Sequence, residues 1–198
     1  MANVNMPNGF RALKYAYERG SYIGQGRKYW FAGSGILGVG DPVVRATGSS
    51  SSDANGLGPL IVRASTGSYL TGHIIGFDPV EPALTQVGYL NNTAGYVYVC
   101  DDPDVWFVVQ EGGSGTALTV QNIGQSINAI TAVNANTTIG TSLYQIDNST
   151  VTTASTGTYI IEELYQAANV ATGQYAKWVV SVNLHTQRSS GASSILAI

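Results

Sequence analysis

The chain has 198 residues, a net charge of −3 and only 11% charged side chains, less than half the usual fraction of about 25%. This length suffices for one domain with a proper core, and the net charge argues against a nucleic-acid-binding protein. The 24 glycines and the many Ser, Thr and Asn residues are typical of short strands joined by turns. The one cysteine, Cys100, excludes an intramolecular disulfide, and we expect it to behave as a small buried hydrophobe.

The charges are divided unevenly along the chain. Residues 1–28 carry a net charge of +4, and the remaining residues carry −7. We therefore expect residues 1–26 to form an extended arm that meets a different partner from the body. A basic terminus without a partner is the alternative. The start of the chain, MANVNMPNGF, lacks a charged segment followed by an apolar one, so we expect no signal peptide.

Short apolar or alternating runs, bounded by Gly, Pro, Asn, Asp and Ser, predict strands along most of the chain. In chain order these runs are RKYWFAG, DPVVRA, LIVRAS, YLTGHIIGF, GYVYVC, VWFVVQ, SINAITAV, SLYQI, TYIIEEL and YAKWVVSVNLH. In the last run, Ala176, Trp178, Val180, Val182 and Leu184 point one way and Tyr175, Lys177, Val179, Ser181 and Asn183 point the other, which indicates one core face. GYVYVC alternates similarly, with Val97 and Val99 opposed to Tyr96, Tyr98 and Cys100. VWFVVQ is apolar on both faces, which indicates a central strand that is covered on both faces. Helix signals are weak, with one helical turn expected in ALTVQNIGQ.

These elements predict an all-β protein with a single β-barrel or β-sandwich domain over residues 27–188. They leave the extended N-terminal arm over residues 1–26 and a C-terminal tail over residues 189–198. No apolar run approaches the roughly 20 residues that a membrane span needs. We therefore expect a soluble protein, made in a cytoplasm, with neither a membrane nor a nucleic acid as partner.

The segment CDDPDVWFVVQEG places three carboxylates beside a tryptophan. Pro103 suits the second position of a type I turn, with Asp102 before it accepting backbone N–H bonds. A calcium loop needs wider, regular ligand spacing and a bending Gly, which this segment lacks. We therefore predict a hairpin connection that binds no metal, followed by a buried Trp106.

The sequence offers no clear catalytic motif. GSGILG matches a dinucleotide fingerprint formally, but Asp41-Pro42 stops the helix that such a fingerprint must open. Glu162 and Glu163 are adjacent, so on a strand we expect them to point to opposite faces. His73 and His185, the two histidines, have no metal-ligand spacing. We expect no enzyme activity, no cofactor and no metal site, and keep a hydrolase as a minor alternative because serine is common.

The N-terminal segment MANVNMPNGFRALKY resembles the opening of small structural proteins of tailed bacteriophages. Ala12 stands where a proline is common in those proteins. Further similarities follow in order, and together they span most of the chain. They are GDPVV, IIGFDP, VCDDPDVWFVVQE and AKWVVSVNLHTQ. The matching N-terminal positions are Ala2, Asn3, Asn5, Pro7, Gly9, Phe10, Arg11, Lys14 and Tyr15.

The resemblance implies a capsid decoration, or cement, protein. Such a protein is made in the bacterial host cytoplasm, binds the major capsid protein on the outer surface of the virion, and is β-rich and often a homotrimer rather than a dimer. The arm would supply charge and amphipathic anchors, the residue types favoured at interfaces. Its expected partner-binding residues are Phe10, Arg11, Lys14, Tyr15, Tyr17, Arg19 and Tyr22.

Two other virion roles stay open. The 12 Tyr and 3 Trp residues suggest a glycan-binding or receptor-binding module. The plainer interpretation is that Trp30, Trp106 and Trp178 lie within strands and fill the core. A head-fibre or tail component is the other alternative.

Overall fold

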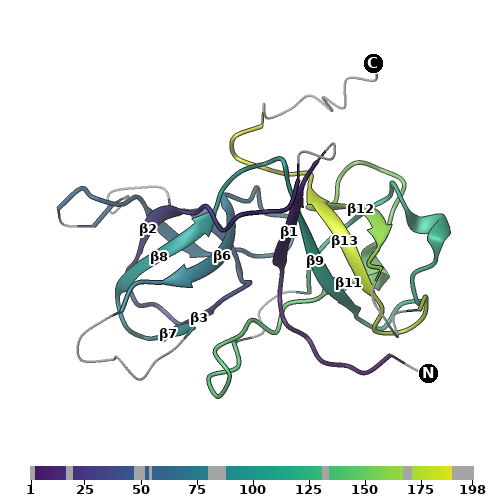
Figure 1. Cartoon of the computed structure of the whole chain (residues 1–198), viewed down its shortest axis with the longest axis horizontal. Helices are drawn as coiled ribbons and strands as arrows, with labels where there is room; N and C mark the ends of the chain where they lie inside the picture. Colours follow the sequence, from purple (N-terminus) through teal and green to yellow (C-terminus); the bar gives the residue numbers. More distant parts are fainter. Residues whose placement is uncertain are drawn as a thin grey trace.

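The computed structural model describes residues 3–16, 20–46, 52–53, 55–79, 88–130, 134–166 and 171–188. In this part of the chain the structure is nearly all β, as expected (Figure 1). The strands form two lobes, which we call the barrel lobe and the sheet lobe. The helical turn expected in ALTVQNIGQ is present as the 3-10 turn η2 (Val120–Asn122), and a second 3-10 turn is η3 (Asn148–Thr150).

The barrel lobe is a closed barrel with the strand order β2-β5-β4-β6-β8. Val97 and Val99 of β8 point inward, whereas the intervening tyrosines point outward, so the predicted alternation is confirmed. A small sheet of β3 (Ile36–Gly38) and β7 (Tyr89–Asn91), which the sequence analysis did not predict, adjoins the barrel in Figure 1. The barrel strands are β2 (Arg27–Phe31), β4 (Pro42–Arg45), β5 (Leu60–Arg63), β6 (Gly72–Phe77) and β8 (Gly95–Cys100).

The sheet lobe is a sheet with the strand order β1-β9-β13-β12-β10, and a further strand, β11, pairs in parallel with the end of β9. Trp178, Val180 and Val182 on β13, and Ala176 just before it, lie in one buried cluster, which confirms the predicted core face, although Leu184 after the strand is only half-buried. On the opposite face, Val179 and Ser181 are buried too. Strand β9 is central, as predicted. The strands are β1 (Arg11–Tyr15), β9 (Val105–Gly112), β10 (Ser126–Ile127), β11 (Ile146–Asp147), β12 (Tyr159–Leu164) and β13 (Lys177–Val182).

The runs SINAITAV and SLYQI form less strand than expected. The first contributes β10, with its residues 131–133 outside the described part of the chain, and the second contributes only the start of β11. Both segments carry many side-chain hydrogen bonds. For example, Asn128 accepts from the Thr158 backbone at 3.0 Å. Polar groups that bond locally to backbone offer the chain an alternative to a regular ladder.

The two lobes share one core. Ala64, Leu70 and Cys100, from the barrel side, belong to the same buried cluster as Phe107 and Trp178 of the sheet lobe. The barrel has its own smaller core around Tyr29, Phe31 and other inward side chains. The chain is therefore best described as one all-β domain with a barrel at one end.

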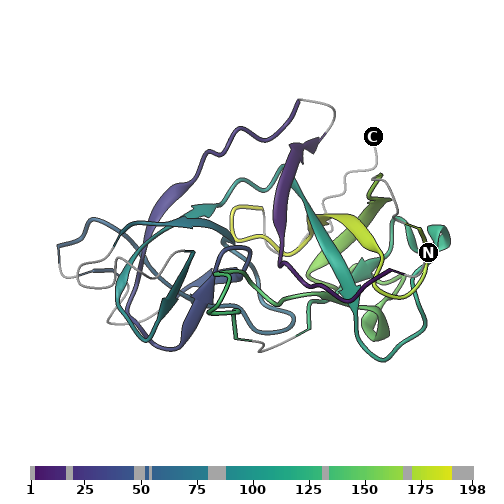
Figure 2. The same ribbon diagram turned by 60° about the horizontal axis from the view of Figure 1, so that its bottom comes forward.

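The predicted boundary at residue 27 is corrected by the structure. Strand β1 pairs antiparallel with β9, and Phe10 is 1% exposed. Residues 3–16 are thus part of the folded domain rather than an arm that leaves it. Residues 20–26 then cross from the sheet lobe to β2 of the barrel lobe (Figure 2). The predicted tail, residues 189–198, lies outside the described residues.

Candidate partner-binding surface

Among the described residues, the aromatic side chains predicted to anchor the arm pack inward instead. Phe10 stacks on Tyr159 with ring centroids 4.5 Å apart and lies in the sheet-lobe core. Tyr15 and Tyr22 pack against the same core, and their rings are 5.9 Å apart. Burial raises the pKa of Tyr22, whose hydroxyl donates to the backbone oxygen of Gln25. Phe10 is therefore not available to a partner, and the two tyrosines are only partly so.

The predicted basic residues of β1 do reach the surface. Arg11 pairs across the strands with Val108, and Lys14 pairs with Trp106, so these four side chains share the face of the sheet that points away from the core. Tyr17 and Arg19, the remaining predicted residues, lie outside the described part of the chain. We call the surface formed by Arg11, Lys14, Trp106, Val108 and Glu163 the outer sheet face.

Lys14 is the centre of the outer sheet face. Its Nζ lies 5.0 Å from the centroid of the Trp106 ring and 2.7 Å from Oε1 of Glu163. The Lys14 and Glu163 side chains are 34% and 43% exposed, so the ion pair is solvated and contributes little to stability. The arrangement holds a cation over a tryptophan on an accessible sheet face.

Trp106 itself is only partly buried, so the prediction of a buried Trp106 is wrong. Its strand is apolar on both faces, and Val105, Phe107 and Val109 take the core face. Trp106 is left on the opposite face, under Lys14. Trp30 is also partly exposed, and of the three tryptophans Trp178 fills the core.

Arg11 is held in place by Asn8, which lies shortly before β1. Its Nε donates to the Asn8 backbone oxygen at 3.0 Å, and its NH2 group donates to the Asn8 side chain at 2.6 Å. Partial burial lowers the pKa of Arg11, which stays far above neutrality for a guanidinium. The cation is therefore fixed at the start of the strand.

The segment before β1 is fastened by side-chain amides, a contact for which the sequence carries no local signal. The buried Gln110 donates to Val4 O at 2.8 Å and to Tyr175 O at 3.0 Å, and it accepts from Met6 N at 2.9 Å. Val4 and Met6 are 68% and 69% exposed. This segment therefore presents two apolar side chains to solvent from a fixed backbone.

The Asp-rich segment is a turn, as predicted, but not a hairpin. Asp102 Oδ1 accepts from the Asp104 backbone N–H at 2.9 Å. Strand β8 before it pairs within the barrel, and β9 after it pairs within the sheet lobe, so the segment links the lobes. Arg188 fastens this link, because its NH2 group donates to Pro103 O at 2.6 Å. That no metal binds this segment stays a prediction.

The described residues show little that resembles a catalytic centre. Among them, no three His, Cys, Asp or Glu side chains are grouped to hold a metal ion. GSGILG leads into β3 and a turn, not a helix. A β-bulge at Glu162 brings Glu162 and Glu163 to one face, contrary to the expectation. Their partners differ, because Glu162 accepts a hydrogen bond from the Ser181 hydroxyl at 2.6 Å, whereas Glu163 forms the ion pair with Lys14.

Cys100 is 1% exposed, in line with the expectation of a small buried hydrophobe. Burial raises the pKa of its thiol to about 11, which leaves little reactive thiolate at neutral pH.

Comparisons of the chain with protein-family models, curated proteins and solved structures find no match. Within the residues that the structure describes, no helix is long and apolar enough to cross a membrane.

Proposed function

We propose that the chain is a structural virion protein that binds the outside of a tailed-phage capsid and stabilises contacts between major capsid protein subunits. The observation that carries this proposal is the ordered series of motifs, from MANVNMPNGFRALKY to AKWVVSVNLHTQ, that resembles decoration proteins. The nearly all-β fold supports it, because the resemblance implies a β-rich protein. Self-association as a homotrimer, and residence on the outer capsid surface, rest on the same resemblance.

We propose the outer sheet face as the surface that meets the capsid protein. Trp and Arg are the residue types most enriched at interface hot spots, and this face offers Trp106 beside Arg11 and Lys14. Its cations would guide docking by charge, whereas the indole would supply buried area. This proposal replaces the inward-facing Phe10, Tyr15 and Tyr22 as the main contacts.

The location of the protein tests the function directly. Virions of the phage that encodes the chain are labelled with gold-conjugated antibodies raised against the purified protein and viewed by electron microscopy. Regular label over the head is the expected result. Label confined to the tail or to a head fibre would replace the proposal with the corresponding alternative, and unlabelled virions would overturn it.

A matched pair of lysines tests the surface. Lys14 lies over Trp106 beside Glu163, and Lys28 of the barrel lobe lies 4.3 Å from the Tyr96 ring centroid beside Asp78. We expect Lys14→Ala to weaken binding to undecorated capsids about tenfold, or about 1.4 kcal/mol. Lys28→Ala is the control and should bind normally. Equal effects of the two variants would remove the outer sheet face from the proposal.

One observation favours the alternative of a glycan-binding module. On the outer wall of the barrel, Trp30 packs edge-on against Tyr96, whose hydroxyl donates to Asp53. Partly exposed aromatic rings fixed beside carboxylates suit contact with a ligand that has both apolar and polar faces. A glycan array probed with the purified protein, with Trp30→Ala as the comparison, would reveal such binding.

A further inference from the structure

Two buried histidines lie where the barrel lobe meets the sheet lobe. His73 is 0% exposed and belongs to β6 of the barrel, whereas His185 is 2% exposed and follows β13 of the sheet lobe. Each has a buried ring nitrogen that forms no well-aligned hydrogen bond with the described residues, namely Nδ1 of His73 and Nε2 of His185, the latter beside the Thr71 backbone. Buried polar atoms are nearly always paired, so two unpaired imidazole nitrogens at one junction need an explanation.

His73 inserts from the barrel into the aromatic core of the sheet lobe. Its ring centroid lies 4.7 Å from that of Phe10 and 4.2 Å from that of Phe107. Its Nε2 shares a 2.9 Å hydrogen bond with the hydroxyl of Tyr159 on β12. The imidazole is fully buried and thus links the barrel to three separate parts of the sheet lobe.

His185 lies on the segment that ties the sheet lobe back to the barrel lobe. Its Nδ1 accepts from Gln187 N at 3.1 Å, so the proton of the neutral ring is on the unpaired Nε2. On either side of it, Leu70 N donates to Leu184 O and Thr186 N donates to Leu70 O, both at 2.8 Å. These two hydrogen bonds join the lobes directly.

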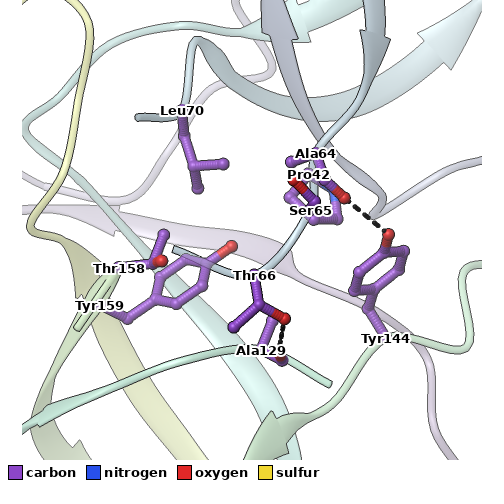
Figure 3. Close-up of a pocket in the computed structure, with 9 residues that line it drawn as sticks. All are labelled: Pro42, Ala64, Ser65, Thr66, Leu70, Ala129, Tyr144, Thr158 and Tyr159. Atoms are coloured by element: carbon purple, nitrogen blue, oxygen red, sulfur yellow. Dashed lines mark hydrogen bonds between the residues drawn. The ribbon is translucent and has the colours of Figure 1, made fainter. Parts of the chain in front are cut away.

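The same junction contains a small cavity with room for about one water molecule. Figure 3 shows that its lining comes from both lobes, with Ala64 and Leu70 on one side and Tyr144 and Tyr159 on the other. Tyr144 donates its hydroxyl to Ala64 O at 3.1 Å across this space. The contact between the lobes is therefore less densely packed beside the partner of His73.

The groups around the two imidazoles are unequal in charge. The titratable groups near His73 are Tyr159 and His185. Within the barrel sheet, His73 pairs with Cys100 of β8 and with Pro42 of β4, which Asp41 precedes in the chain. His185 lies near Arg188, Asp101 and Asp102. Burial, with a smaller effect of His185, lowers the pKa of His73 to about 3. Burial, and then Arg188, lowers the pKa of His185 to about 4, against the opposite effect of Asp101.

We propose that His73 and His185 form an acid-sensitive latch, so that protonation of both imidazoles opens the contact between the two lobes. In the closed state a second proton on either ring would place an unpaired charge in the shared core, which is strongly unfavourable. In the open state water solvates both rings. The barrel has its own core, in which Tyr29 is the titratable member among the described residues, so the barrel itself stays folded.

The sign and size of the effect follow from linkage. Both imidazoles bind protons more weakly in the closed state than in the open state, so acid favours opening. Below the ordinary histidine pKa of about 6.5, each histidine raises the open-to-closed ratio up to tenfold per pH unit. Two histidines together raise it up to about a hundredfold per unit until His185 begins to titrate in the closed state, near pH 4.

Hydrogen exchange between pH 7 and pH 4.5 tests the latch. After correction for intrinsic rates, the opening equilibrium of the Leu70 and Thr186 amides at the junction should rise up to about a hundredfold for each unit by which the pH is lowered. The opening equilibrium of amides within the barrel ladder should not change. In each of the single variants His73→Gln and His185→Gln, we expect this pH dependence of opening to fall to about tenfold per pH unit. In the double variant, opening should no longer depend on pH. Asp78→Asn, a change at a titratable barrel residue paired with Lys28, is the control and should behave like the wild type.

NMR of the unmodified protein keeps the proposal testable if a variant does not fold. The chain has two histidines, so their imidazole signals can be followed through the same pH range. Both should report neutral rings at neutral pH and should become protonated together with the opening of the junction amides. Signals that titrate near pH 6.5 in the closed protein, or barrel amides that open in parallel with the junction, would overturn the latch.

Discussion

Trp178 donates its indole N–H to the buried carboxylate of Glu111, with Nε1 and Oε2 2.7 Å apart. Glu111 lies on β9 and Trp178 on the neighbouring strand β13, and both are 0% exposed. The other carboxylate oxygen, Oε1, accepts from Leu118 N at 3.3 Å. Burial raises the pKa of Glu111, and these hydrogen bonds lower it in part. One carboxylate thus satisfies two donors within the core.

Replacing this carboxylate by an apolar side chain should destabilise the protein. Glu111→Leu leaves the N–H groups of Trp178 and Leu118 without an acceptor, and each unsatisfied buried donor costs about 1–3 kcal/mol. We expect a loss of about 3 kcal/mol in the free energy of unfolding, measured by urea denaturation. Glu111→Gln keeps one acceptor oxygen and should lose less. Equal losses in the two variants would show that hydrogen bonding is not the cause.

The two tryptophans of the sheet lobe should differ sharply in their contribution to stability. Trp178→Ala removes a fully buried indole and should cost about 3–5 kcal/mol. Trp106→Ala removes a partly exposed indole under Lys14 and should cost about 1 kcal/mol. Thermal and urea unfolding of both variants checks this order. A larger loss for Trp106→Ala would mean that the outer sheet face is covered in solution.

Gln110 should control the attachment of the N-terminal segment. Gln110→Ala removes the acceptor of Met6 N and the donor to Val4 O, so residues 3–8 should lose protection from proteolysis and hydrogen exchange. Strand β1 pairs with β9 through its own backbone and should stay protected. Asn3→Ala, which removes side-chain bonds to Ala171 O and Gln174 O, is the milder comparison. A segment that stays protected in Gln110→Ala would contradict this role.

Asp41 should make stability fall as the pH rises through the weakly acidic range. Burial raises the pKa of this carboxyl from 3.8 to about 6, against hydrogen bonds from Ser142 and Gly38. Its neutral form is therefore favoured in the folded state. The resulting stabilisation is present below pH 3.8 and is lost as the pH approaches 6, on the order of 3 kcal/mol in all.

Asp41→Asn isolates this effect from that of the histidines, which acts in the opposite direction. Asparagine keeps an acceptor for the Gly38 N–H, which Asp41 Oδ2 binds at 2.9 Å. The difference in unfolding free energy between wild type and variant should thus change by about 2 kcal/mol between pH 4 and pH 7. A constant difference would show that Asp41 is ionised throughout.

The sequence predicted what depends on local pattern. The alternation in β13 and β8 is local, and both core faces were predicted correctly. Strand β1 was missed because a β-bulge between Ala12 and Lys14 interrupts the alternation that marks a strand. The composition of residues 1–28 indicated charge but carried no information on the partner strand.

Strand partners and the choice of face could not be read from the sequence. Strands β8 and β9 are separated by a short turn, which favours a hairpin, but each pairs with strands distant in the chain. Residues 105–109, VWFVV, are apolar at every outward and inward position, so the pattern could not say that Trp106 points away from the core. The contacts of Gln110 with Val4 and Met6 join residues more than a hundred positions apart and leave no local signal.

The pairing of β1 with β9 has a consequence for modularity. All strands of the barrel lobe lie between these two strands in the chain, so the barrel is an insertion into the sheet lobe. The two points where the insertion begins and ends are neighbours, because Tyr15 of β1 faces Val105 of β9. Domain insertion is tolerated best where the entry and exit points of the inserted part lie close together. A module put in place of the barrel would therefore need ends that match this spacing. It would also need apolar side chains in place of Ala64, Leu70 and Cys100, which the barrel contributes to the shared core.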